Sequence, residues 1–239
     1  MGILISGNEP TADKNKTAVY SIIIMALASL SVVIPLTLLS NVYAVFFLYY
    51  IGMCLLVPFS DLIIRRKLSF TEALRFLGFR RENRKKSITV GLIHGSIILG
   101  LMIGGFFALR EVFISSDIVS TLTQWGVTGN TKWILFFLMV IFNGIVEEIF
   151  WRGYTFGRLK DTLQKWPAIL IVTFFYTSYH LATVLTFFKV SFMGIQTVIL
   201  IFMAGLLWGW MRYRFQDILA ATIGHTLLTI GYMTVFMLV

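Results

Sequence analysis

Long apolar runs alternate with short polar segments along most of this chain. Each of these runs is close to the ~20 residues that an α-helix needs to cross the hydrocarbon core of a membrane. The expected bounds of the seven runs are Val19–Leu39, Ala44–Ile64, Ile88–Leu109, Trp133–Trp151, Pro167–Phe188, Phe192–Met211 and Ile218–Val239. The pattern therefore predicts an all-α protein, a polytopic transmembrane helical bundle of about seven helices (six to eight).

Composition agrees with this pattern. Of the 239 residues, 58% are hydrophobic and only 13% are charged, whereas about a quarter of the residues in a soluble domain are charged. So few charges cannot cover a globule of this size, which excludes an ordinary soluble protein. The net charge of +9 would suit a nucleic-acid-binding protein, but the distribution of lysine and arginine along the chain favours a membrane protein that binds no nucleic acid.

Lysine and arginine are concentrated on one side of the predicted topology. That side carries 17 of the 20, and the other side carries only Arg110, Lys132 and Lys189. Because positively charged loops face the cytoplasm, we predict a cytoplasmic N-terminus and an external C-terminus. The short chain shows no organelle signal, so the expected location is a plasma membrane, most simply a bacterial one.

The chain divides into a polar tail at residues 1–18 and one transmembrane domain at residues 19–239. Residues 65–87 form a basic loop that carries nine of the lysines and arginines. Within it, Ser69 and Glu72 have the spacing of a capping box at the start of a helix. We predict a short amphipathic helix on the anionic inner leaflet, and the alternative is a solvated basic loop.

Several ionisable residues lie inside the predicted spans, where a charge costs at least a few kcal/mol and is seldom without a function. The fourth span carries Glu147 and Glu148, the fifth carries His180, and the seventh carries His225. A single histidine in a membrane is often a structural hydrogen-bond partner. Two histidines and two glutamates on three helices indicate a polar site instead, whereas His94 has no such companions and is expected to be structural or interfacial.

The fourth span suggests separate roles for its two glutamates. Residues four positions apart lie on the same face of a helix. Glu148 and Arg152 have this spacing, and so do Asn143 and Glu147. We predict that Glu148 forms an ion pair with Arg152, while Glu147 faces the bundle interior, bonds Asn143 and acts as a base. The alternative is that both glutamates extend to the cytoplasmic interface.

The expected depths of these residues do not match well. At ~1.5 Å per residue, Glu147 is roughly 7 Å from the cytoplasmic end of its helix, His225 roughly 12 Å and His180 roughly 20 Å. A later start, a tilt or a kink of the fifth helix would be needed to bring His180 level with Glu147.

The polar residues lie in three motifs that carry a family likeness. "EEIFWRG" resembles the Glu-Glu-x-x-x-Arg motif of the CAAX-protease and bacteriocin-processing family, also called Abi. "YTSYH" resembles its Phe-x-x-x-His motif with Tyr176 in place of phenylalanine, and "HTLLT" resembles its His-x-x-x-Asn motif with Thr229 in place of asparagine. The likeness covers residues 133–229.

This resemblance implies an intramembrane endopeptidase that cuts a peptide or a membrane-protein substrate. Glu147 would activate water, with Glu148 beside it, His180 would position the water, and His225 with residue 229 would stabilise the oxyanion. Glu147, His180 and His225 are also a set that can bind zinc. The chain has no His-Glu-x-x-His sequence, so we favour the glutamate mechanism over the metal-dependent one.

Two other functions are compatible with the sequence. Thr229 lacks the amide that the family motif provides, which favours a catalytically weak or inactive relative that acts as a bacteriocin-immunity or scaffold protein. Acids and histidines in a membrane also relay protons in transporters. The chain shows no inverted repeat, which argues against a transporter.

Overall fold

A computed structural model describes residues 11–114 and 118–239, and every regular element within those ranges is a helix. The elements named η are π-helical. In chain order they are α1 (Thr11–Thr37), α2 (Val42–Val45), η1 (Phe46–Leu56), α3 (Val57–Phe59), η2 (Ser60–Arg65), α4 (Phe70–Leu77), α5 (Arg84–Ala108), α6 (Arg110–Ile114), α7 (Ile118–Gln124), α8 (Asn130–Leu138), η3 (Met139–Asn143), α9 (Gly144–Glu148), η4 (Ile149–Thr155), α10 (Phe156–Leu159), α11 (Lys165–Phe188), α12 (Phe192–Phe215) and α13 (Leu219–Leu238).

Seven helical stretches among the described residues are long and apolar enough to cross a membrane, which confirms the predicted fold class. These first to seventh spans are Lys14–Thr37, Val42–Arg65, Arg84–Ala108, Asn130–Leu159, Lys165–Phe188, Phe192–Phe215 and Leu219–Leu238. The largest difference from the prediction is in the fourth span, which continues beyond the predicted end at Trp151 as far as Leu159.

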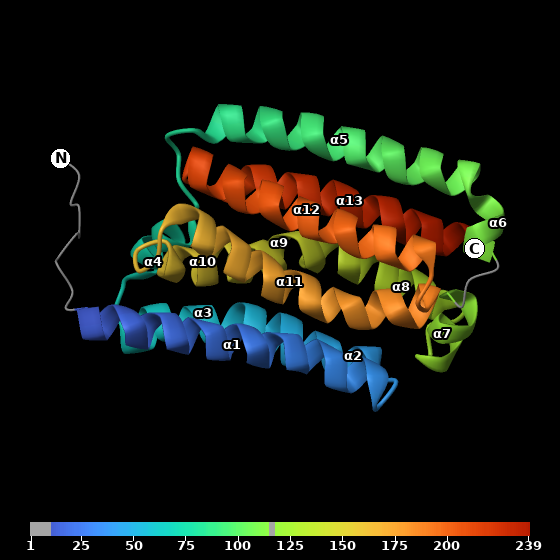
Figure 1. The fold of residues 1–239 in the computed structure, drawn as a ribbon, viewed down its shortest axis with the longest axis horizontal. Helices are drawn as coiled ribbons and strands as arrows, with labels where there is room; N and C mark the ends of the chain where they lie inside the picture. Colours follow the sequence, from blue (N-terminus) through green and yellow to red (C-terminus); the bar gives the residue numbers. More distant parts are fainter. Residues whose placement is uncertain (1–10, 115–117) are drawn as a thin grey trace.

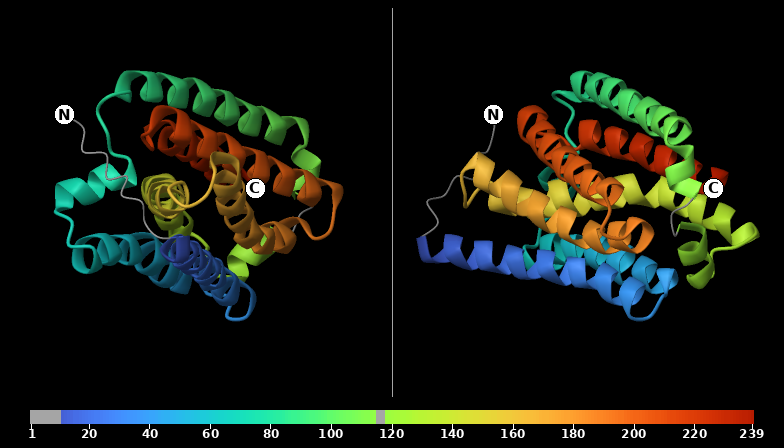
Figure 2. Two further views of the ribbon diagram at one scale, coloured as in Figure 1. Left: turned by 60° about the vertical axis from the view of Figure 1, so that its left-hand side comes forward. Right: turned by 45° about the vertical axis from the view of Figure 1, so that its right-hand side comes forward.

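The fourth span lies in the middle of the bundle, where side chains from several neighbouring helices can contact it. Its segment α9 contacts α13 on one side and η1 on the other. The helix α5 lies outside α13, and α1 lies with the second span on the opposite side of the bundle, as Figures 1 and 2 show. Residues on α9 are therefore enclosed by protein on both sides.

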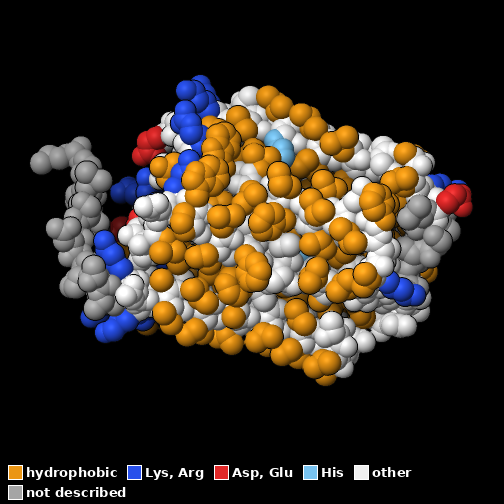
Figure 3. All heavy atoms as spheres, in the orientation of Figure 1, with side chains coloured by type: hydrophobic (Ala, Val, Ile, Leu, Met, Phe, Trp, Pro, Cys, Tyr) orange, Lys and Arg blue, Asp and Glu red, His pale blue; other side chains and the backbone are white. Residues whose placement is uncertain are grey.

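The surface is divided as expected for a protein that spans a membrane. In Figure 3, hydrophobic side chains cover most of the visible face, and lysine and arginine gather at its two ends, with more of them at the end that carries α4 and α10. The chain is thus a multi-pass integral membrane protein in its architecture. The cytoplasmic location of the N-terminus stays a prediction.

The fourth span is not a uniform α-helix, because two π-helical segments flank the short α9. A π turn is wider than an α turn and occurs frequently at functional sites. All seven residues of η4 are buried, as are Glu147 and Glu148 immediately before it. The polar motif therefore lies at a change of helix geometry inside the bundle.

A close approach between the fourth and seventh spans depends on Gly144. A methyl group added at Gly144 would lie 2.7 Å from the backbone nitrogen of Thr226, closer than atoms pack. We expect Gly144→Ala to destabilise the protein by about 1–3 kcal/mol through overpacking. The unfolding midpoint in sodium dodecyl sulfate would measure this loss. Gly104→Ala is the matched control, because a methyl group at Gly104 meets nothing within 4 Å, and an equal loss in both variants would contradict the prediction.

The predicted amphipathic helix is α4, and its capping box is formed. The backbone nitrogen of Ser69 donates to Glu72 Oε2 at 2.9 Å, and the Glu72 nitrogen donates to Ser69 Oγ at 3.3 Å. The hydrogen bonds from Ser69 lower the pKa of the Glu72 carboxyl. Ala73 and Leu77 are fully buried against the bundle, whereas Phe70 is 60% exposed. Part of the apolar side of α4 therefore packs on protein, and its contact with the leaflet stays a prediction.

An ion cluster joins the second span to the added turns of the fourth. The carboxylate of Asp61 accepts from Arg158 at 2.7 Å and lies 3.2 Å from the Arg66 guanidinium, and Arg65 also binds it. Asp61 and Arg158 are both buried. The ion pair with Asp61 balances the charge of Arg158, so this arginine can stay buried inside the bundle.

Candidate active site

The longer fourth span removes the predicted mismatch in depth. Measured from Leu159, Glu147 lies roughly 18 Å along its helix, and His180 lies roughly 22 Å along α11 from Lys165. A direct contact between the two helices agrees with this, because the hydroxyl of Tyr179 donates a hydrogen bond to Glu147 Oε2 at 2.7 Å. The error was in the predicted end of the fourth helix, and the fifth helix needs no special geometry.

Glu147 is buried, with 1% of its surface exposed. Its hydrogen-bond partners are Tyr179 of the fifth span and Tyr49 of the second, whereas the sequence predicted Asn143. Nε2 of His225 lies 3.8 Å from Glu147 Oε2. The carboxylate thus faces two neutral hydroxyls and an imidazole from three different helices.

The predicted ion pair between Glu148 and Arg152 is confirmed. Arg152 Nη1 lies 2.9 Å from Glu148 Oε1, and both side chains are completely buried. The guanidinium also lies over the rings of Tyr176, at 4.4 Å, and Trp208, at 5.3 Å. Cation–π contacts of this kind favour a desolvated arginine. The aromatic residue of the second motif, Tyr176, therefore packs against the arginine of the first.

His225 joins the two glutamates. Its Nδ1 lies 3.0 Å from Glu148 Oε1, and a carboxylate only accepts, so Nδ1 carries the proton. In the neutral ring, Nε2 then has a lone pair, and it faces Asn143 Nδ2 at 3.1 Å. The indole of Trp208 stacks on the imidazole at 4.5 Å with an interplanar angle of 19°. The tautomer and the orientation of His225 are both fixed.

Asn143 connects three spans. Its Oδ1 accepts from the hydroxyl of Tyr50 at 2.6 Å, and its Nδ2 donates to Thr229 Oγ1 at 3.0 Å and to the Tyr232 hydroxyl at 3.2 Å. Tyr50 belongs to the second span, and Thr229 and Tyr232 belong to the seventh. The amide is therefore held from both of its ends.

His180 stands at the edge of this cluster. Its Nδ1 donates to the backbone carbonyl of Tyr176 at 2.7 Å, which leaves Nε2 as an acceptor. Its ring packs at 4.1 Å on Tyr179, whose hydroxyl binds Glu147. His180 is half-buried, unlike Glu147 and His225. It is linked to Glu147 through Tyr179.

Five residues of the cluster were not predicted as part of it. Tyr179 was missed because the second motif specifies only the residues at positions 176 and 180. Tyr49, Tyr50 and Trp208 lie outside the three motifs. His94 was expected to be structural or interfacial, and it accepts a hydrogen bond from Trp208 Nε1 at 3.2 Å. It thereby supports the indole that stacks on the imidazole of the seventh span.

The residues do not fit a three-ligand zinc site. Within residues 11–114 and 118–239, no group of three histidine, cysteine, aspartate or glutamate side chains is arranged to hold a metal ion. In the set that the sequence suggested, His225 Nε2 faces the Asn143 amide at 3.1 Å and lies 3.8 Å from Glu147 Oε2.

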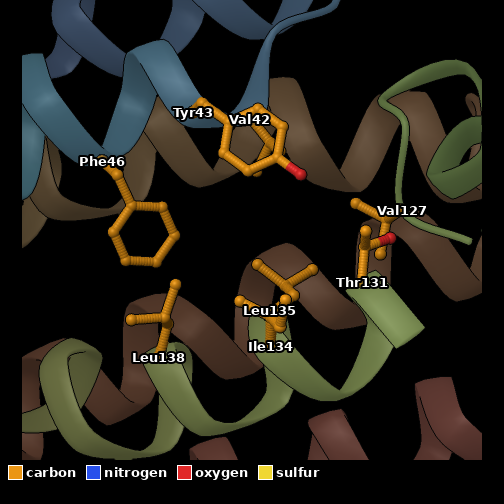
Figure 4. Close-up of a pocket in the computed structure, with 8 residues that line it drawn as sticks. All are labelled: Val42, Tyr43, Phe46, Val127, Thr131, Ile134, Leu135 and Leu138. Atoms are coloured by element: carbon orange, nitrogen blue, oxygen red, sulfur yellow. The ribbon is translucent and has the colours of Figure 1, made fainter.

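The two cavities described in the structure do not reach these residues. One is an apolar depression between the second and fourth spans, shown in Figure 4. Its lining residues are Val42, Tyr43, Phe46, Val127, Thr131, Ile134, Leu135 and Leu138. The other lies near the end of α13, against α7 and α8. Glu147 and His225 line neither of them, and both side chains are buried.

Comparison with known proteins agrees with the motifs. Residues 129–231 match the family model described as type II CAAX prenyl endopeptidase Rce1-like. The matched segment contains the fourth, fifth and sixth spans and the first part of the seventh, and it includes every site residue that the sequence suggested. It confirms the resemblance that was drawn over residues 133–229. No curated protein and no solved structure shows a match.

Proposed function

From the Rce1-like domain at residues 129–231, we propose that this protein is an intramembrane endopeptidase that hydrolyses a peptide bond in a peptide or membrane-protein substrate. The observation that carries the proposal is the division of roles between two adjacent buried glutamates. Glu148 is neutralised by Arg152 at 2.9 Å, while Glu147 is bound by neutral hydroxyls, those of Tyr179 at 2.7 Å and of Tyr49. Such a carboxylate is suited to take a proton from water.

The chemical step follows from these roles. The oxygen of a water molecule attacks the carbonyl carbon of the peptide bond, and Glu147 takes one proton from that water. The carbonyl becomes an oxyanion. When the carbon–nitrogen bond breaks, Glu147 returns the proton to the leaving amine, and an amine and a carboxylic acid, which ionises in water, are released. This scheme uses only groups of this chain and water, and the zinc-dependent alternative is one outcome of the test below.

The two histidines have different parts in this scheme. His180 presents a free Nε2 at the half-buried edge of the cluster, where it accepts a hydrogen bond from the incoming water. His225 is fixed by Glu148 on one side and by Trp208 on its face. Its Nε2 accepts from the Asn143 amide at 3.1 Å, so it helps to hold that amide in the same cluster as Glu147.

The proposal is tested by cleavage in a defined membrane. The purified protein is reconstituted in lipid vesicles with synthetic peptides that carry one apolar segment, with and without a C-terminal isoprenyl cysteine. Products are identified by mass spectrometry, before and after treatment with a zinc chelator. Vesicles prepared identically from cells without the protein are the control. Protein-dependent cleavage that survives the chelator supports the proposal. Loss with chelator that zinc restores would contradict the metal-free scheme, and no cleavage of any peptide would contradict the function.

A further inference from the structure

The hydroxyl of Thr229 is not free to stabilise an oxyanion. It donates its single proton to the backbone carbonyl of His225, one turn earlier in α13, at 3.0 Å. Its oxygen then accepts from Asn143 Nδ2 at the same distance. A serine or threonine hydroxyl has only one proton, so Thr229 has none left for a substrate.

The same bond fixes the orientation of the Asn143 amide. Because Thr229 Oγ1 uses its proton on the backbone, the atom that faces it must be a donor, which is Nδ2 and not Oδ1. The hydroxyl of Tyr50 donates to Oδ1 on the other side of the amide. His225 Nε2, which carries a lone pair, is also 3.1 Å from Nδ2. All of these contacts agree on one orientation.

Asn143 Nδ2 therefore has two protons and three acceptors around it, namely Thr229, His225 and Tyr232. One proton is held by Thr229. The other is shared between the imidazole and the phenol, and a carbonyl oxygen that becomes negatively charged is a better acceptor than either. The amide needs no rotation to make this bond, because Tyr50 and Thr229 already fix its orientation. Preorganised donors of this kind stabilise a transition state most effectively.

The position of Asn143 relative to the base is also suitable. Asn143 and Glu147 are four residues apart, and both are buried in the middle of the bundle. Side chains at this spacing lie on one face of a helix with their Cβ atoms about 5–6 Å apart. A peptide carbonyl between them would present its carbon to water bound at Glu147 and its oxygen to the amide.

We propose that Asn143 of the fourth span supplies the N–H donor for the oxyanion, in place of residue 229 of the seventh span. The amide that the family motif carries at position 229 is thereby provided from the facing helix, where it touches both Thr229 and His225. This inference rests on the proposed function of the site. It explains how the chain can hydrolyse a peptide with a threonine in its last motif.

The test compares four variants with wild type in the vesicle assay. Asn143→Asp has the same shape but no N–H donor, and we expect it to lower kcat by about 10²–10³-fold with a small change in KM. Thr229→Val is expected to lose less than about tenfold, because its hydroxyl only supports the amide. Asn143→Ala combined with Thr229→Asn returns an amide from the other helix, and it should recover at least about tenfold over Asn143→Ala alone.

The unfolding midpoint in sodium dodecyl sulfate is measured for every variant, so that a loss of fold is separated from a loss of catalysis. A purely structural Asn143 would lower the midpoint and the activity together, and Thr229→Asn would not rescue kcat. An equal or greater loss of kcat in Thr229→Val than in Asn143→Asp would also overturn the inference. If wild type cleaves no peptide, the proposed function fails and this inference fails with it, whereas cleavage by wild type with no effect of Asn143→Asp refutes this inference alone.

Discussion

Glu147→Gln is expected to reduce kcat for peptide hydrolysis by about 10²–10⁴-fold, the usual contribution of a general base. Glutamine keeps the shape of the side chain, and its amide oxygen still accepts the hydrogen bond from Tyr179. It cannot take a proton from water at neutral pH. The fold should therefore persist while the chemical step is lost. The measurement is kcat in the vesicle assay, with product formation followed by mass spectrometry.

Glu72→Gln is the matched control for this prediction. Glu72 caps α4 outside the membrane-spanning segments and lies far along the chain from the polar cluster, so the same chemical change there should leave kcat within about twofold of wild type. Full activity in Glu147→Gln would show that another group activates the water, and the assignment of the base would have to be abandoned.

Much of the architecture could be predicted, because the length and apolarity of a membrane span are properties of the local sequence. The seven spans and the capping box of α4 follow from such local patterns. So does the ion pair of Glu148 with Arg152, because residues four apart meet on one face of a helix.

The end of the fourth span could not be predicted in the same way. Arg152 and Arg158 looked like residues of the cytoplasmic interface, since a charge is costly in a membrane. Both are buried in the structure, because Arg152 meets Glu148 and Arg158 meets Asp61. Asp61 lies on another helix, 97 residues away in the chain. A charge that is neutralised by a distant partner does not end a span, and local hydropathy cannot detect that partner.

The partners of Asn143 were missed for a similar reason. Spacing along one helix suggested Glu147 as its partner, whereas the structure assigns its amide to Tyr50, 93 residues away, and to the seventh span, more than 80 residues away. The motifs identified which residues take part, and packing between helices decided which atoms meet. The site residues therefore followed from the sequence better than their hydrogen bonds did.

Arg152→Met is expected to destabilise the protein by about 3–5 kcal/mol, because it leaves the carboxylate of Glu148 buried without its counter-ion. Both side chains are fully buried, so water cannot replace the lost partner. Methionine retains the length of the arginine stem and its contact with the aromatic rings. The free energy of unfolding in sodium dodecyl sulfate measures the loss, and Arg75→Met, on the exposed side of α4, is the control in which no such loss is expected.

The double variant Glu148→Gln/Arg152→Met separates stability from catalysis. Removing both charges leaves no unpaired ion, and replacing a whole buried pair is often neutral for stability. We expect the free energy of unfolding to return to within about 1–2 kcal/mol of wild type. Catalysis should not return, because the neutral amide that replaces Glu148 accepts a weaker hydrogen bond from His225 Nδ1 than a carboxylate does, and the imidazole that faces Asn143 is no longer held as firmly. A double variant that regains both stability and activity would mean that Glu148 and Arg152 only hold the helices together, and that Glu147 works without the charge of its neighbour.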